Sequence, residues 1–286
     1  MNHYSLDIGG TNSRFSIIDK DGNIVFLEKK LTPKHEIELS EMISDFFVRT
    51  GDAFELSEDI GVSVAGLYDN KNNSVIFPNA FEGKKLNVAG LFKNVKIENL
   101  YVSDDRTAGI YGEKYFGQGK DMEEFIYLII GTGVGLGIMK NDTVLNGADF
   151  VAGSVGWIKY DQEYSFEQVL AGPGIAGYYQ KISGKKADSK EVFKRYLNHE
   201  DENSYKTVKR TGEALGKMLS FILNFTNPHR IILGGSIGKQ WEFLKGFSES
   251  IIFENISPYI KTVDIKVSHL DDNATLLGNV GRITRV

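Results

Sequence analysis

The sequence predicts an α/β protein in which two domains repeat one order of strands and helices. The chain has 286 residues, which is enough for two domains of ordinary size, each with its own core. Two glycine-rich loops of the same build, one per half, carry the prediction. Residues 6–14 read LDIGGTNSR and residues 130–137 read IGTGVGLG. Each loop is entered from an apolar, strand-like run and left through another.

The first half begins as a β-meander and then alternates helices with strands. Asp21-Gly22 is a strong signal for a tight turn, and apolar residues at spacings of three and four predict a helix that ends near Gly51. A second helix is expected after Asp105, running to about Phe116. The predicted strands are residues 4–8, 14–18, 24–27, 60–65 and 100–102, and the apolar face of the first helix is Leu39, Met42, Ile43, Phe46 and Phe47.

The second half repeats this order. The predicted strands are residues 125–130, 137–139, 143–145, 230–233 and 263–267, and two helices are expected around residues 166–170 and 208–224. Two more amphipathic helices follow, one with Trp241, Leu244, Phe247 and Ile251, and a closing one with Leu276, Leu277 and Val280. No proline-rich linker marks a boundary, so we expect the domains to meet through a hinge.

The composition excludes several classes of protein. Apolar residues make up 41% of the chain and charged residues 25%, as in ordinary soluble proteins. The net charge of −5 argues against nucleic acid as a partner. The longest apolar run, residues 125–130, is too short to span a bilayer, and no secretory signal is expected because Asp7 interrupts the N-terminus. Zero cysteines exclude disulfides and thiolate metal sites and fit a cytoplasmic protein.

The two glycine-rich loops are predicted to bind an anion. Glycine lets the backbone approach a phosphate closely, and a hairpin tip has free N–H groups. A Walker loop is excluded because the chain holds no Gly-Lys-Ser/Thr. A dinucleotide fingerprint is excluded because Leu136 and Ile138 stand where its third glycine would fall. Ordinary hairpin turns remain the alternative for either loop taken alone.

With these motifs the chain resembles the ROK family of sugar kinases and sugar-responsive repressors, within the actin-like ATPase superfamily. DIGGT at residues 7–11 resembles the first phosphate loop of the family, GTGVG at 131–135 the second, and LGGS at 233–236 the loop on the adenosine side. SDDR at 103–106 through Gly112-Glu113 aligns with the Asn-Asp-Ala-Asn … Gly-Glu stretch of the family. The resemblance implies two actin-like (ribonuclease H-like) domains with an interdomain cleft, formed by residues 1–105 plus 275–286 and by residues 106–274.

The resemblance implies cofactors and the residues that hold them. ATP and Mg²⁺ are the expected cofactors, and Asp7 is expected to hold Mg²⁺ through water, although it can also cap a turn. Arg14 can reach the same anion or stay solvated on its strand. The implied phosphate and nucleotide contacts are Asp7, Gly9, Gly10, Thr11, Gly131, Thr132, Gly133, Gly135, Gly234 and Gly235.

Asp105 is the candidate general base. A sugar hydroxyl needs a proton acceptor as it attacks the γ-phosphorus, and Asp105 takes the place of the catalytic aspartate of the family when counted back from Glu113. The alternative is a helix N-cap, a role that aspartate also fills well. Because Asp104 adjoins it, one of the two can cap the helix while the other catalyses. Asp104 also replaces an asparagine that binds sugar in the family.

The resemblance also implies contacts with the hydroxyl groups of the bound sugar, at Gly66, Asn79 and Glu167. The alternative for Asn79 is a plain turn, and the alternative for Glu167 is a solvated position on a helix. The chain departs from the pattern at Ser154 and Trp157, which replace a glutamate and a zinc-binding histidine. Trp157 either stacks on a sugar face or packs in the core. The cysteines of the zinc site are absent, so no structural zinc is expected.

The expected function is ATP-dependent phosphorylation of a hexose-type sugar hydroxyl, at O6, with Asp105 as the base. The alternative is a catalytically impaired sugar-binding regulator of the ROK type. Repressors of the family carry an N-terminal helix-turn-helix, for which we expect no room before the first loop. The expected partners are the sugar and ATP, with no nucleic acid and no membrane. Because dimers are common in the family, a homodimer is compatible with the resemblance.

Overall fold

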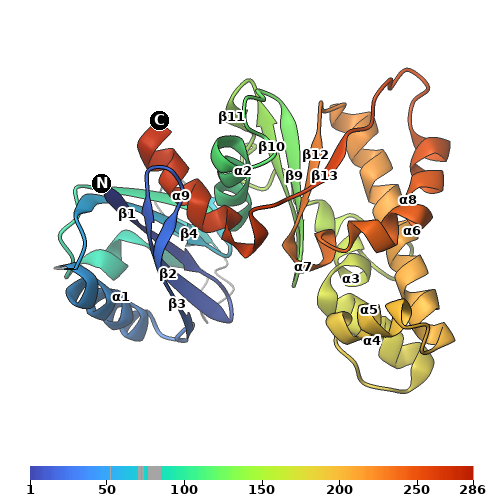
Figure 1. Ribbon diagram of the computed structural model, residues 1–286, viewed down its shortest axis with the longest axis horizontal. Coiled ribbons are helices and arrows are strands. Elements are labelled where there is room, and N and C mark those ends of the chain that lie inside the picture. The colour runs from blue at the N-terminus through green and yellow to red at the C-terminus, as the bar shows by residue number, and fades with distance from the viewer. Residues whose placement is uncertain (52, 70–71, 73, 77–84, 286) are drawn as a thin grey trace. The chain divides into compact units, whose positions relative to one another are not determined.

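The computed structural model describes residues 1–51, 53–69, 72, 74–76 and 85–285 (Figure 1). The chain folds into two compact units of mixed α/β structure. The first consists of Met1–Met122, Val144–Ala152 and Asn273–Val286, and the second of Glu123–Thr143 and Gly153–Asp272.

The first unit is built on a five-stranded sheet in the order β3-β2-β1-β4-β8. The first three strands form antiparallel pairs, whereas β4 and β8 run parallel to β1. Their bounds are β1 Asn2–Ile8, β2 Asn12–Asp19, β3 Ile24–Leu31, β4 Leu56–Val64 and β8 Asn99–Asp104. The other elements are α1 Glu36–Gly51, α2 Asp105–Phe116, α9 Ala274–Arg285, the short η1 Ala89–Phe92, and a small sheet of β5 Leu67–Asp69, β6 Ser74–Ile76 and β7 Lys85–Asn87.

The two faces of this sheet carry different side chains because successive residues of a strand alternate in direction. Tyr4 and Leu6 of β1 belong to the apolar core that includes Phe46 of α1, whose ring lies 5.5 Å from that of Tyr4. On the other face, the Ser5 hydroxyl donates a hydrogen bond to the carbonyl of Leu276 in α9, at 2.7 Å. Helix α1 therefore covers one face of the sheet and α9 the other.

Helix α2 packs against α9 at close range. A Cβ added to Gly112 of α2 would collide with the carbonyl oxygen of Ala274, and one added to Gly278 would collide with that of Ala108. These contacts put α2 in the first unit. Residues 144–152 join it as well. The predicted domain boundary after residue 105 assigned both segments to the second domain.

The second unit repeats the arrangement with the sheet order β11-β10-β9-β12-β13. Strands β9 and β10 are antiparallel, and β12 and β13 run parallel to β9. The strands are β9 Phe125–Ile130, β10 Val134–Lys140, β11 Thr143–Val144, β12 Ile231–Gly234 and β13 Ile265–Val267. The helices are α3 Phe166–Leu170, α4 Gly172–Ser183, α5 Ser189–Leu197, α6 Glu202–Thr226, α7 Gly235–Gly238 and α8 Trp241–Asn255, with short η2 Val155–Trp157 and η3 Asp271–Asn273.

The predicted α/β class and the repetition of one strand order are confirmed, and each glycine-rich loop joins the first two strands of its sheet. Helices α4 and α5 were not predicted from the sequence. Pro173 lies at the first positions of α4, where a proline is compatible with a helix. The signal for α5 was the N-cap, because the Asp188 carboxylate accepts a hydrogen bond from the Glu191 amide.

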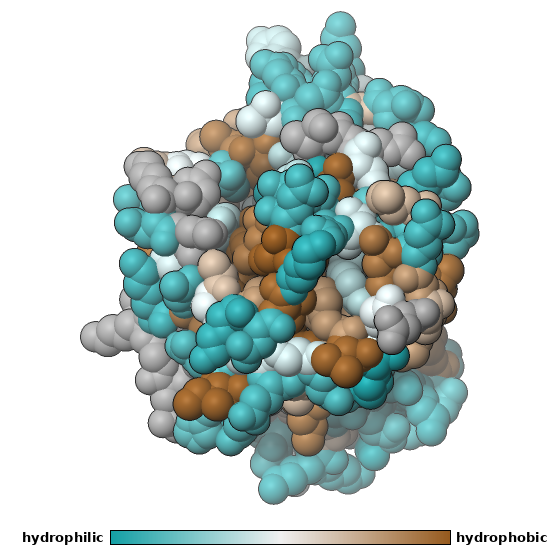
Figure 2. Space-filling view, turned by 90° about the vertical axis from the view of Figure 1, so that its left-hand side faces the viewer, coloured by the Kyte–Doolittle hydropathy of each residue, from teal (hydrophilic) through white to brown (hydrophobic). Residues whose placement is uncertain are grey.

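The surface mixes polar and apolar side chains. Figure 2 shows hydrophilic side chains interspersed with smaller apolar areas on the face turned to the viewer. Scattered exposed apolar residues of this kind are normal for folded proteins. Among the described helices, none is both long enough and apolar enough to cross a membrane.

Candidate functional site

The first glycine-rich loop is a closed hairpin tip with spare amide donors. The Gly9 N–H donates to the Asn12 carbonyl at 3.1 Å, and a Cβ on Gly9 would lie 2.5 Å from that oxygen. Thr32 donates two hydrogen bonds to the loop, one from its hydroxyl to the Gly9 carbonyl and one from its amide to the Thr11 carbonyl. Within the described ranges, no acceptor binds the amides of Gly10 and Thr11. These two donors are available to an anion.

The second loop has the same character. The Gly131 N–H donates to the Gly133 carbonyl at 2.9 Å, and the Gly131 carbonyl accepts from the Gly172 amide at the start of α4, at 2.8 Å. In the described part of the chain, the amides of Thr132 and Gly133 find no acceptor. This tip, like the first, presents two consecutive backbone donors.

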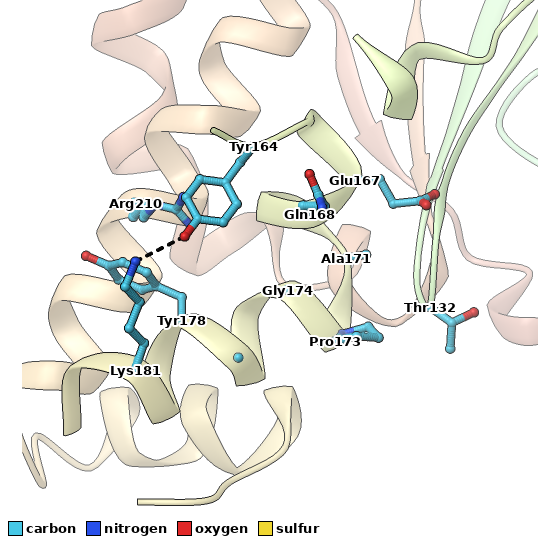
Figure 3. Close-up of a pocket in the computed structure, with 11 residues that line it drawn as sticks. Thr132, Tyr164, Glu167, Gln168, Ala171, Pro173, Gly174, Tyr178, Lys181 and Arg210 are labelled. Carbon is cyan, nitrogen blue, oxygen red and sulfur yellow. Dashed lines mark hydrogen bonds between the residues drawn. The ribbon is translucent and has the colours of Figure 1, made fainter. Parts of the chain in front are cut away.

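Glu167 is attached to the second loop and does not point to solvent. Its Oε2 accepts a hydrogen bond from the Val134 amide at 2.9 Å. Figure 3 shows Glu167 and Thr132 at one end of a pocket in the second unit that has a volume of about 470 Å³. Glu167 is thus half-buried and tied to the loop through one oxygen, and its contact with sugar stays a prediction.

The glycines that follow β12 are explained by close packing. Gly235 has a φ of +78°, and a Cβ there would collide with the carbonyl oxygen of Ile130 at the end of β9. A Cβ on Gly234 would collide with the Tyr127 hydroxyl. Packing alone accounts for both glycines, and their contact with adenosine stays a prediction.

The carboxyl ends of the parallel strands in the first unit bring acidic side chains to one edge of the sheet. Ile8 of β1 pairs with Val64 of β4, which pairs with Asp104 of β8. Asp7 and the two aspartates that end β8 and begin α2 therefore share this edge. Ligand sites of open α/β sheets lie at the same place.

Asp7 is held by two side chains. Its Oδ2 accepts from Arg14 Nη2 at 2.7 Å and from Arg14 Nε at 3.1 Å, and its Oδ1 accepts from the Ser63 hydroxyl at 2.8 Å. Arg14 Nη2 also donates to the Thr275 hydroxyl of α9 at 2.7 Å. Arg14 is thus paired with Asp7, and the alternative of a solvated strand residue is wrong. The sequence carried no signal for Thr275, which is 261 residues away.

Of the two adjacent aspartates, Asp104 is the helix cap. Its Oδ1 accepts from the Thr107 amide at 2.7 Å, and its Oδ2 accepts from Arg106 Nη2 at 2.7 Å. The Arg106 guanidinium also donates to the carbonyls of Phe150 and Ala152. Asp104 is buried, and these two bonds hold its carboxylate in place.

Asp105, the first residue of α2, is left without the capping role. Its Oδ1 accepts only the adjacent Arg106 amide at 2.9 Å among the hydrogen bonds of the described residues. Burial of the carboxyl group, together with the negative charges of Asp104 and Asp7, raises the pKa of Asp105 to about 7, although Arg106 partly opposes this shift. A carboxylate with this pKa can take up a proton near neutral pH.

The other residues predicted to contact the sugar lie in different surroundings. Trp157 lies in η2 and is 83% exposed, so its packing in the core is excluded. Ser154 directly precedes η2. Gly66 follows β4 with a φ of +154°, which a side chain would disfavour. Asn79 lies outside the described residues.

Metal ligands do not gather in the described part of the protein. No group of three or more His, Cys, Asp or Glu side chains there is arranged to hold a metal ion. The expectation that the protein binds no zinc stays a prediction. A magnesium ion brought in with a nucleotide needs fewer protein ligands, because Mg²⁺ keeps several waters and binds phosphate oxygens.

Two sheets of one strand order, each with a glycine-rich hairpin tip, define a protein of two actin-like domains. The chain belongs to the ROK family, whose sequence profile matches residues 3–283. It is 24% identical to a glucokinase of Thermotoga maritima over 96% of this chain and 94% of that protein. It is 25% identical to a xylose repressor of Bacillus spizizenii over 96% of this chain and 74% of the repressor. The structure of a ROK family glucokinase from Streptomyces griseus in complex with glucose and AMPPNP superimposes with a TM-score of 0.83 at 19% identity, covering 98% of both chains.

Proposed function

We propose that the protein transfers the γ-phosphoryl group of ATP to O6 of a hexose-type sugar, with Asp105 as the general base. The proposal rests on one observation above the others. Asp104 takes over the capping of α2, and Asp105 keeps a carboxyl group whose pKa lies at about 7. The kinase relatives agree in reaction class.

The base acts by accepting the proton of the attacking hydroxyl. With a pKa of about 7, roughly half of the Asp105 side chains are ionised at neutral pH, and these are competent to accept a proton. The ionised form is destabilised by its surroundings, so uptake of the proton relieves repulsion from Asp104 and Asp7. A fully solvated aspartate, which ionises near pH 4, would gain far less from this transfer.

The polyphosphate of ATP would bind to the two hairpin tips. In the first unit we assign it to the amides of Gly10 and Thr11, and in the second to those of Thr132 and Gly133. The two threonine hydroxyls add donors of the same kind. Phosphoryl transfer depends mainly on such positioning and on neutralisation of charge.

Asp7 fits the magnesium role through water. A carboxylate has about four acceptor positions, and Arg14 and Ser63 occupy three of them with hydrogen bonds. The remaining one can accept a hydrogen bond from a metal-bound water, which suits a cation that retains its hydration. When bound, Mg²⁺ would neutralise the charge that the phosphates carry.

The sugar would be bound by the remaining predicted residues. We propose Gly66, Asn79, Asp104, Ser154, Trp157 and Glu167 as its contacts. Glu167 Oε1 keeps its capacity to accept a hydroxyl proton in a hydrogen bond, because Oε2 makes the bond to the loop. Trp157 presents an exposed indole, and aromatic rings of this kind stack on sugar faces.

The second candidate function is a sugar-responsive regulator, which the similarity to xylose repressors favours. A protein that only binds sugar has no use for an aspartate whose ionised form is destabilised at neutral pH. This difference makes the two functions separable by experiment.

The test is an ADP-release assay with ATP and Mg²⁺ against a panel of hexoses, N-acetylhexosamines and glycosides. We expect turnover with at least one sugar, and a loss of about 10²–10⁴-fold in kcat for Asp105→Asn. Thermal-shift measurements should show that this variant still binds the sugar. Asp149→Asn, at an exposed position of the first unit, is the matched control. Turnover by Asp105→Asn at the wild-type rate contradicts the assignment, and sugar binding without any turnover supports the regulator.

A further inference from the structure

The pocket in the second unit has two chemically different ends (Figure 3). Lys181, Arg210, Tyr164 and Tyr178 lie at one end, and Glu167 and Thr132 lie toward the other. Its volume of about 470 Å³ is within the range of small-molecule sites. The lining comes from helices α3, α4 and α6, the segment before α3 and Thr132 of the second glycine-rich loop.

Arg210 has a cationic group with unused donors. Its guanidinium lies 4.4 Å from the ring centroid of Tyr178 and 5.1 Å from that of Tyr164. Among the described residues, no acceptor forms a hydrogen bond or salt bridge with it, so all five of its N–H groups are available. A guanidinium held by aromatic rings is oriented for bidentate binding of an oxyanion.

Lys181 adds a second positive charge beside a hydroxyl donor. Its Nζ lies 3.1 Å from the Tyr164 hydroxyl, which raises the pKa of Lys181 and keeps it protonated. The nearby carboxylates of Asp161 and Glu163 form no salt bridge with Lys181 or Arg210 within the described ranges. Asp161 is instead occupied by the amides of Glu163 and Tyr164, at 2.8 and 2.7 Å. This end therefore carries two positive charges that form no salt bridge in the described part of the chain, with the carboxylates of Asp161 and Glu163 close enough to interact with Arg210 and Lys181 through space.

The opposite end suits hydroxyl groups. Glu167 offers a free carboxylate oxygen, Gln168 an amide and Thr132 a hydroxyl. The wall between the two ends is formed by small or apolar residues, including Ala171 and Pro173. A ligand that satisfies both ends has an oxyanion on one side and several hydroxyls on the other.

We propose that this pocket is a binding site for a sugar phosphate, with the phosphate at Lys181, Arg210 and Tyr164 and the sugar hydroxyls at Glu167 and Gln168. Because Glu167 is bonded to the Val134 amide, a bound ligand contacts the residue that braces the second glycine-rich loop. The pocket belongs to the second unit alone. Glu167 and Thr132 belong to the proposed kinase site as well, whereas Lys181, Arg210 and Tyr164 do not, so these three residues distinguish the two proposals.

The test uses glucose 6-phosphate, glucose, inorganic phosphate, AMP and adenosine as probes in calorimetry with the full chain. We expect saturable binding of glucose 6-phosphate that weakens with added salt, and much weaker binding of inorganic phosphate. Any binding of glucose at the proposed kinase site should be unaffected by substitution of Lys181 or Arg210. Lys181→Gln and Arg210→Gln should each raise the Kd for glucose 6-phosphate about tenfold or more. Lys217→Gln is the matched control, because Lys217 lies 4.6 Å over the Tyr160 ring outside the pocket lining, and it should change Kd by less than about twofold.

Several results would overturn the proposal. One is the absence of saturable binding of glucose 6-phosphate at millimolar concentration. Another is an unchanged Kd for glucose 6-phosphate in both pocket variants. The third is adenosine binding that is as tight as that of glucose 6-phosphate and sensitive to the same substitutions. Lys181 is exposed, so its variant is expected to fold even if Arg210→Gln does not, and circular dichroism checks both.

Discussion

Replacement of Asp105 by asparagine should stabilise the folded protein while it abolishes turnover. The folded chain holds the Asp105 proton up to about pH 7, whereas the unfolded chain releases it near pH 3.8. Stability is therefore lost as the pH rises through this window of about three pH units, and the loss is complete above pH 7. At 1.36 kcal/mol per unit, ionisation of Asp105 costs the folded state about 4 kcal/mol at most. Asparagine keeps the shape of the side chain and the acceptor for the Arg106 amide, and removes this cost.

Urea denaturation without ligands measures the effect. At pH 8 we expect the free energy of unfolding of Asp105→Asn to exceed that of the wild type by about 1–4 kcal/mol. The lower figure applies if solvent reaches the Asp105 carboxylate and screens its charge. At pH 5 the difference should be smaller by up to about 3 kcal/mol, because the wild type is still protonated there in the folded state. Asp149→Asn should show no such dependence on pH. A variant that is less stable than the wild type at pH 8, or a difference that does not change with pH, refutes the reasoning.

Three further outcomes are expected. The wild-type kcat/KM should fall below pH 7, to about one tenth of its plateau at pH 6, because only ionised Asp105 accepts a proton; a flat profile between pH 6 and pH 8 contradicts this. Arg14→Gln should lower the free energy of unfolding by roughly 1–3 kcal/mol, since it removes the paired donors of the largely buried Asp7 carboxylate, and denaturant titration measures the loss. Gly235→Ala should destabilise the protein by at least about 1 kcal/mol through its positive φ and the collision with Ile130, and an unchanged Tm would show that the backbone adjusts.

The absence of zinc is open to direct measurement as well. The chain has no cysteine, and Trp157 stands where the resemblance places a histidine ligand. Metal analysis of purified protein should therefore find far less than one equivalent of zinc. Stoichiometric zinc that survives dialysis against a chelator would contradict the prediction.

The strand-like runs and the two loops were readable because their signals are local. The Asp21-Gly22 turn and the strand-like run at residues 4–8 depend on neighbours a few residues apart, and the observed elements agree with them. The helix after Asp105 was predicted for the same reason. The ends of elements were less accurate, as in α6, which starts at Glu202 where the Asp201 cap forms and not at residue 208.

The sequence alone determined the α/β class, the repetition of one strand order and the pair of adjacent aspartates, either of which can cap a helix. Only the tertiary structure decided which aspartate caps, that Arg14 pairs with Asp7, and that Arg210 meets Lys181 at one end of a pocket. The physical reason is the distance along the sequence between the residues that interact. Hydrogen bonds within a turn follow from residues side by side, whereas burial and charge at Asp105 depend on β1, β8 and α2 meeting at one sheet edge.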